Sequence, residues 1–166
     1  MLLKPALLAL LALPLCAFAH SGHHHGHNAS HASETSSPAT APEGVRVQDC
    51  WIRTMPPQVP SGGYFIVHND TDHPVSLTGI ASPAFAETML HQTVTRDGMA
   101  RMMHIDAVEV PARGNLAFKP GSYHAMLEKP TQDLQIGSTV AVKLMFGAAG
   151  TVSTDCTLRA PATVAG

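Results

Sequence analysis

The sequence predicts an all-β protein, a sandwich or barrel of about nine short strands. Short apolar runs recur from residue 45 onward, turn-forming residues separate them, and no long amphipathic helical pattern is visible. Short strands at this spacing are typical of sandwiches and barrels. With 166 residues, the chain can build one domain with a core of its own.

The first five expected strands lie between residues 45 and 105. They cover residues 45–53, 62–69, 75–80, 86–94 and 99–105. Each ends at residue types that favour turns, among them Pro56-Pro57, Asn69-Asp70 and Asp97-Gly98. The Arg96-Asp97-Gly98 turn predicts that 86–94 and 99–105 form an antiparallel hairpin.

Four more expected strands complete the domain. They cover residues 115–119, 123–127, 139–146 and 150–159, and glycines and prolines at 111–114, 120–121 and 147–150 separate them. The run 123–127 is bounded by a Pro-Gly-Ser turn signal and by a Lys-Pro pair. It therefore predicts a short, well-delimited strand.

The first 19 residues predict a cleaved signal peptide and hence an exported protein. A Leu/Ala-rich run follows Lys4 and ends at Ala17-Phe18-Ala19, a pattern of small residues that signal peptidase cleaves. Cys16 raises the alternative of a lipoprotein, but Leu15 before it is larger than the residue that lipidation favours. An uncleaved membrane anchor is a second alternative, which the short apolar run disfavours.

Residues 20–43 are expected to form a histidine-rich, disordered tail and linker. Small polar residues and prolines dominate the linker, as is typical of disordered segments. The domain is then expected at 44–160, with a short C-terminal tail at 161–166. Neutral imidazoles bind Cu(II), Ni(II) and Zn(II) alike, so the tail predicts metal collection, with a cloning tag as the alternative. The tail histidines are His20, His23, His24, His25, His27 and His31.

An imidazole and a thioether share one face of the expected strand 123–127. Side chains alternate along a strand, so His124 and Met126 point one way while Tyr123, Ala125 and Leu127 form an apolar face on the other side. The expected hairpin adds His91 from one strand and Met102 from the next. These four side chains are predicted to converge on one patch.

Two imidazoles with two thioethers are a ligand set suited to Cu(I). The ion is soft and accepts sulfur and nitrogen in preference to oxygen. Thioethers also suit an exported protein, because paired thiols in an oxidising compartment tend to form a disulfide and no longer bind metal. The patch of His91, Met102, His124 and Met126 therefore predicts a Cu(I) site.

The ligand spacing H-x10-M-x21-H-x-M resembles the signature of the PCuAC family of periplasmic copper chaperones, with every interval matched. The likeness covers roughly residues 45–159. It includes 49–53 followed by Pro56-Pro57, the Asp97-Gly98 turn, Val110-Pro111 before a glycine turn, and the run 119–124. The histidine-rich tail is not part of the core pattern.

This resemblance implies a cupredoxin-like β-barrel in the periplasm that binds Cu(I) through the four motif residues. It also implies transfer of copper to a partner, namely the binuclear copper site of cytochrome c oxidase in subunit II, or another copper chaperone. The tail would add Cu(II) capture. No stable membrane insertion is expected. Nucleic acid is not an expected partner either, because the net charge is -2 and no Lys/Arg run is present.

Three other functions are weighed against a chaperone. A passive copper store is the main alternative, and movement of copper to an acceptor would distinguish the two. A blue-copper electron carrier needs a Cys thiolate beside two His, and neither Cys50 nor Cys156 has such a neighbourhood. An oxidative enzyme using His20 as an N-terminal chelator would need a rigid site, so no enzymatic activity is expected.

The remaining methionines and histidines have structural interpretations. His68 and His73 flank the Asn-Asp turn and are expected in exposed loops. His104 shares a strand face with Met102, which leaves open whether it joins the site. Packing, or a place around the site, is the role expected of Met89, Met99, Met103 and Met145.

Cys50 and Cys156 are the two cysteines that remain after export, and they are predicted to form a disulfide. They lie in the first and last expected strands, which are often neighbours in a closed barrel or sandwich. An exported protein favours oxidation. A pair of buried free thiols is the alternative.

Overall fold

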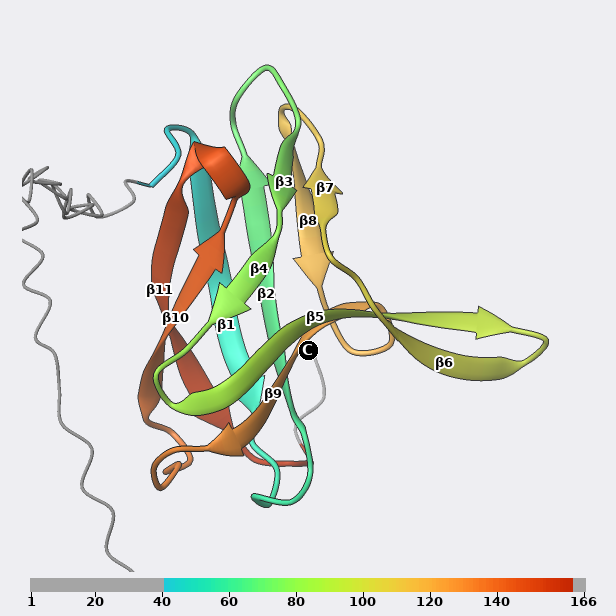
Figure 1. Cartoon of the computed structure of the whole chain (residues 1–166), viewed down its shortest axis with the longest axis vertical. Helices are drawn as coiled ribbons and strands as arrows, with labels where there is room; N and C mark the ends of the chain where they lie inside the picture. Colours follow the sequence, from blue (N-terminus) through green and yellow to red (C-terminus); the bar gives the residue numbers. More distant parts are fainter. Residues whose placement is uncertain (1–40, 163–166) are drawn as a thin grey trace, which may run out of the picture. The chain divides into compact units, whose positions relative to one another are not determined.

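Residues 41–162 are described by the computed structural model, and they consist almost entirely of β-strands and the turns between them (Figure 1). The all-β class predicted from the sequence is confirmed. The expected signal peptide and the tail histidines lie outside the described residues. The elements are β1 (Val45–Arg53), β2 (Ser61–Asn69), β3 (Val75–Leu77), β4 (Gly79–Ala81), β5 (Phe85–Arg96), β6 (Met99–His104), β7 (Val108–Val110), β8 (Gly114–Phe118), β9 (Tyr123–Pro130), β10 (Thr139–Met145), the 3-10 helix η1 (Gly147–Ala149) and β11 (Thr151–Arg159).

The described residues contain eleven strands, where the sequence predicts about nine. The expected strand 75–80 is in fact two strands, because the chain changes its pairing partner at Thr78. The N–H and the hydroxyl of Thr78 both donate to the carbonyl of Met145, at 2.8 and 3.1 Å. The second additional strand, β7, has three residues and pairs only with β3, so it is too short for alternation to reveal it.

Nine strands form one mixed sheet, in the order β4-β10-β11-β1-β2-β9-β5-β6 with β8 also paired to β2. Strands β1 and β11 run parallel, and β3 with β7 makes a separate two-stranded sheet. Side chains from strands far apart in this order meet in one core, for example Ile52 of β1, Leu90 of β5 and Leu144 of β10. The sheet thus curls over itself as a sandwich. No helix within residues 41–162 is long and apolar enough to cross a bilayer.

Strands β5 and β6 form the predicted hairpin, which extends away from the core (Figure 1). Its two-residue turn has positive φ at both Asp97 (54°) and Gly98 (75°). This backbone matches the twist of paired strands, and Asp and Gly tolerate it best. All six residues of β6 are exposed, so the hairpin has little of the core behind it.

The predicted disulfide between Cys50 and Cys156 is present, with the two Cα atoms 4.5 Å apart. Trp51 of β1 pairs with Thr157 of β11, so the two cysteines follow directly from the strand register. A bulge between Gln48 and Trp51 places Cys50 outside the β1–β2 pairing. The bridge ties the first strand to the last across a separation of 106 residues.

Removing the bridge should destabilise the fold strongly, because it closes a long loop. The double variant Cys50→Ala, Cys156→Ala should lose roughly 2–5 kcal/mol in the free energy of unfolding, measured by denaturant titration. Mass spectrometry of the exported protein after alkylation without reductant is the direct check. Two alkylated thiols in the folded protein would contradict the bridge.

Candidate metal centre

Three imidazoles lie in a row across β9, β5 and β6. His91 of β5 is directly opposite His124 of β9 on one side and His104 of β6 on the other. Directly opposed residues of antiparallel strands point to the same face. The ring centroids of His91 are 5.8 Å from those of both neighbours, and each contact is edge-on. The imidazole row is therefore a consequence of strand register.

Methionines flank the imidazole row on the same face. Met126 of β9 is opposite Met89 of β5, and Met102 of β6 is opposite Thr93, two residues beyond His91. The alternate residues Leu90, Ala125 and Leu127 are buried in the core. The structure thus places the four motif residues on one face of β9, β5 and β6, as alternation along the strands requires.

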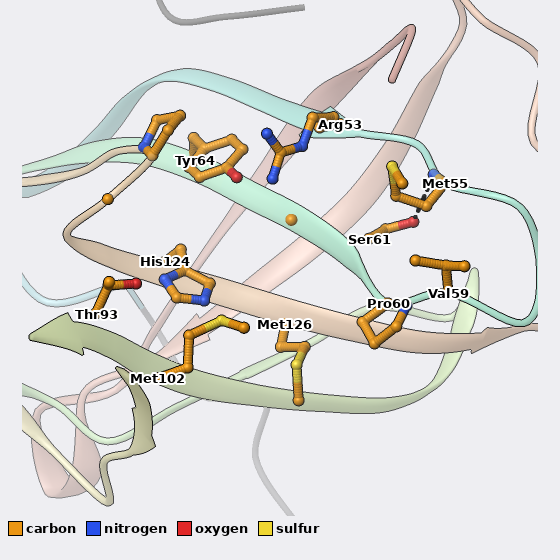
Figure 2. Close-up of a pocket in the computed structure, with 13 residues that line it drawn as sticks. Arg53, Met55, Val59, Pro60, Ser61, Tyr64, Thr93, Met102, His124 and Met126 are labelled. Carbon is orange, nitrogen blue, oxygen red and sulfur yellow. Dashed lines mark hydrogen bonds between the residues drawn. The ribbon is translucent and has the colours of Figure 1, made fainter. Parts of the chain in front are cut away.

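A cavity of about 390 Å³ opens beside this face, and three of the four motif residues line it. Figure 2 shows the side chains of Met102, His124 and Met126 along one side of it. His91 is not among the lining residues and lies behind His124 in the row. The cavity gives solvent access to the face.

Burial differs sharply across the four motif residues. His91 and His124 are only 9 % and 7 % exposed, whereas Met102 is 65 % exposed on the projecting hairpin. Met126 is partly buried. The face therefore has a buried imidazole side and an exposed thioether, that of Met102.

Each buried imidazole keeps a nitrogen available for a ligand. Nδ1 of His124 lies 3.0 Å from the carbonyl of Ser122. A carbonyl only accepts, so Nδ1 donates and Nε2 retains its lone pair. Nδ1 of His91 is buried and has no hydrogen-bond partner among the described residues.

Burial lowers the pKa of His91 below its ordinary value, and the nearby His124 and His104 lower the pKa further, against an opposing effect of Glu128. A lowered imidazole pKa means that the neutral form, which alone can bind a metal, is favoured at neutral pH. The electrostatic environment of His91 therefore favours metal ligation over protonation.

The opposite wall of the cavity carries residues whose roles the sequence did not indicate. Met55, Arg53 and Tyr64 line it, and the guanidinium of Arg53 lies over the Tyr64 ring at 5.6 Å from its centroid. Burial raises the pKa of Tyr64 and Arg53 lowers it, the burial effect being the larger. The only sequence signal for this wall is Arg53, at the end of a run that resembles family positions.

The expectation of an exposed loop for His68 is wrong, and the packing role that was one expectation for Met99 and Met103 is not observed. His68 lies inside β2, which ends at Asn69 as the expected strand 62–69 does, and its Nε2 is buried, so it is not an exposed loop residue; His73 is exposed as expected. Met99 and Met103 are 56 % and 50 % exposed and do not pack in the core. The hairpin extends past the core, so the back face of β6 has no layer to pack against.

Oxygen and nitrogen donors alone do not make a site here. Within residues 41–162, no group of three or more His, Cys, Asp or Glu is close enough to hold a metal ion. The thioethers are therefore the further donors that this face offers beside the imidazoles.

The same fold occurs in solved PCuAC domains, so this chain is a cupredoxin-like β-sandwich similar to them. The apo PCuAC domain of PmoF2 superimposes with a TM-score of 0.62 at 23 % identity, over 76 % of this chain and 98 % of that one. Apo-DR1885 from Deinococcus radiodurans matches with a TM-score of 0.57 at 26 % identity, over 89 % of this chain and 100 % of that one. The expected resemblance to PCuAC proteins is confirmed.

The chain belongs to the LpqE-like family. The family model, described as "Putative lipoprotein LpqE-like", matches residues 45–158. A relative from Rickettsia prowazekii (strain Madrid E), the protein RP573, is 31 % identical over 87 residues, which is 52 % of this chain and 48 % of the relative. The chain thus spans about half the length of that curated relative.

Proposed function

We propose that this protein is an exported copper chaperone that carries Cu(I) on His91, Met102, His124 and Met126. The observation that supports this most directly is their common face, where two buried imidazoles with available nitrogens lie beside two thioethers. The solved relatives include a copper-bound PCuAC domain from PmoF2 and a Cu(I) form of DR1885. Copper is the cargo of such a protein and not a catalytic cofactor.

The residues fit Cu(I) better than a hard divalent ion. A metal lies about 2 Å from an imidazole nitrogen that binds it, so rings with centroids 5.8 Å apart can hold one ion between them. Thioethers are soft ligands that select Cu(I), whereas oxygen-preferring ions gain little from them. The absence of a carboxylate-rich cluster among the described residues agrees with this preference.

The uneven burial of the ligands provides a route for transfer. The two imidazoles are held in place by the sheet, while Met102 is exposed and can leave the ion first. An acceptor ligand could then enter from the open cavity. We propose the binuclear copper site of cytochrome c oxidase as the acceptor, with copper storage as the alternative.

Export and domain layout complete the proposal. Residues 1–19 would be a signal peptide and 20–43 a tail, followed by the copper domain at 44–160 and a short end at 161–166, with the mature protein in the periplasm. The lipoprotein description of the family is consistent with export. It also makes lipidation at Cys16, which would anchor the exported protein to a membrane, the alternative to cleavage after Ala19.

Replacing a thioether should reduce Cu(I) binding and leave the fold intact. Met102→Leu and Met126→Leu should each weaken Cu(I) affinity by at least the ~10–100-fold that loss of an outer-shell partner costs a metal site. Stability of the exposed Met102→Leu variant should change by less than about 0.5 kcal/mol. Competition with a Cu(I) chelator measures the affinity.

Met99→Leu is the matched control, since Met99 is similarly exposed on the same strand but lies on the other face. It should leave the affinity unchanged. X-ray absorption of the Cu(I) form should show sulfur neighbours, and a first shell of nitrogen and oxygen alone would refute the ligand set.

Copper should move directly to an acceptor if the protein is a chaperone. Cu(I)-loaded protein mixed with the soluble copper domain of cytochrome c oxidase subunit II should lose its copper at a rate that rises with acceptor concentration. A store would release copper at a rate set by its own dissociation, whatever the acceptor concentration. Copper that stays on the protein would exclude this acceptor.

The tail is proposed to collect Cu(II) and to raise the metal concentration near the domain through a flexible tether. Deleting residues 20–42 should abolish Cu(II) binding at the tail and leave Cu(I) binding by the domain unchanged. Deleting only 32–42 is the control, because it retains all six tail histidines. Calorimetric titration measures both metals, and loss of domain Cu(I) binding in the first variant would show that the tail contributes ligands.

A further inference from the structure

A second cavity, of about 270 Å³, lies beyond the imidazole row and is lined by soft donors that the proposed site does not use. Met89, His104, Asp106 and Met145 are among the residues that line it. The volume equals several times the ~30 Å³ that one water occupies in the liquid. A metal ion can therefore enter it without displacing the core.

The three donors reach this cavity from three separate elements. Met89 is on β5, two residues before His91 on the same face, and His104 is opposite His91 on β6. Met145 ends β10, where Thr78 fixes its carbonyl. Opposite Met145 is Gly79, where a Cβ would lie only 2.7 Å from the Met145 methyl group. A glycine at this position makes room for the thioether.

Asp106 lies next to His104 and favours it as a metal ligand. Its Nε2 lies 3.2 Å from a carboxylate oxygen of Asp106. The carboxylate accepts, so Nε2 donates its proton and Nδ1 keeps its lone pair. A carboxylate behind a histidine orients the ring and makes its other nitrogen more basic, as in many metal sites. Two thioethers with such an imidazole are donors that favour Cu(I).

We propose that Met89, His104 and Met145 form a second Cu(I) site next to the first. The inference rests on the proposed function, since it takes the same cargo. His91 contacts both His124 and His104 edge-on, with ring centroids 5.8 Å away in each case. The two sites are therefore neighbours along one imidazole row, and a second ion can be held while the first is exchanged.

Methyl NMR of the full chain tests this site residue by residue. The methionine methyl groups are labelled with ¹³C and assigned by single Met→Leu variants, and Cu(I) is added under anaerobic conditions. Cu(I) is diamagnetic, so each methyl reports its own site even though tail histidines also take up metal. We expect Met102 and Met126 to shift first, and Met89 and Met145 to shift together at higher Cu(I), while Met99 and Met103 stay unchanged.

His104→Gln should abolish the shifts of Met89 and Met145 and preserve those of Met102 and Met126. His73→Gln is the matched control, because His73 is also exposed and also paired with an aspartate, Asp72, but lies in a loop away from both cavities. It should leave both sets of shifts unchanged. A circular dichroism melt confirms that each variant is folded.

The outcomes separate the two proposals. Shifts of Met102 and Met126 without shifts of Met89 and Met145 would refute the second site and leave the proposed function standing. No shift at Met102 or Met126 would refute the proposed function itself. Equal shifts at every exposed methionine, Met99 and Met103 included, would indicate nonspecific binding and also overturn the second site.

Discussion

The register of β5 between β9 and β6 is the constraint on which the rest of the site depends. It places His91 opposite both His124 and His104 and places Met89 opposite Met126. A slip of one residue in either pairing would turn the donors of one strand to the opposite face. The core side chains of Leu90, Ala125 and Leu127 resist such a slip, because it would expose them to water. The energy that fixes the donor face thus comes from hydrophobic burial on the other side of the same strands.

Different interactions keep the strand register in the outer half of the hairpin. Beyond His91 the strand pair leaves the core, and its register is kept by the Asp97-Gly98 turn and by backbone pairing alone. Segments with few buried apolar contacts open more readily than the core. Met102 belongs to this part, whereas the two buried imidazoles belong to the stable part. The hairpin therefore combines one buried ligand, His91, with one exposed ligand, Met102, while the second buried imidazole, His124, is on β9.

Alternation and turn chemistry predicted each half of the common face, because both are local, but the join between the halves, with His91 opposite His124, depends on the β5–β9 register. His124 and Met126 are two residues apart on one strand, and the Asp97-Gly98 turn implies the pairing that brings His91 near Met102. The opposition of Met89 to Met126, by contrast, depends on the β5–β9 register, which joins segments far apart in the chain and has no turn of its own. The exposure of Met99 and Met103 was missed for a related reason. Apolar residues on a strand are expected to pack, and only the three-dimensional structure shows that nothing covers the hairpin.

The disulfide also bears on how the proposed cargo would be held. Cys50 and Cys156 are joined, so the soft donors of residues 41–162 that remain free are thioethers, which are uncharged. Neutral thioethers and neutral imidazoles leave the full positive charge of a bound Cu(I) uncompensated. A thiolate on an acceptor would attract that charge, the more strongly where water is excluded. Electrostatics thus favours movement of Cu(I) from a thioether site to a thiolate-containing site, and the disulfide prevents Cys50 and Cys156 from offering a competing thiolate.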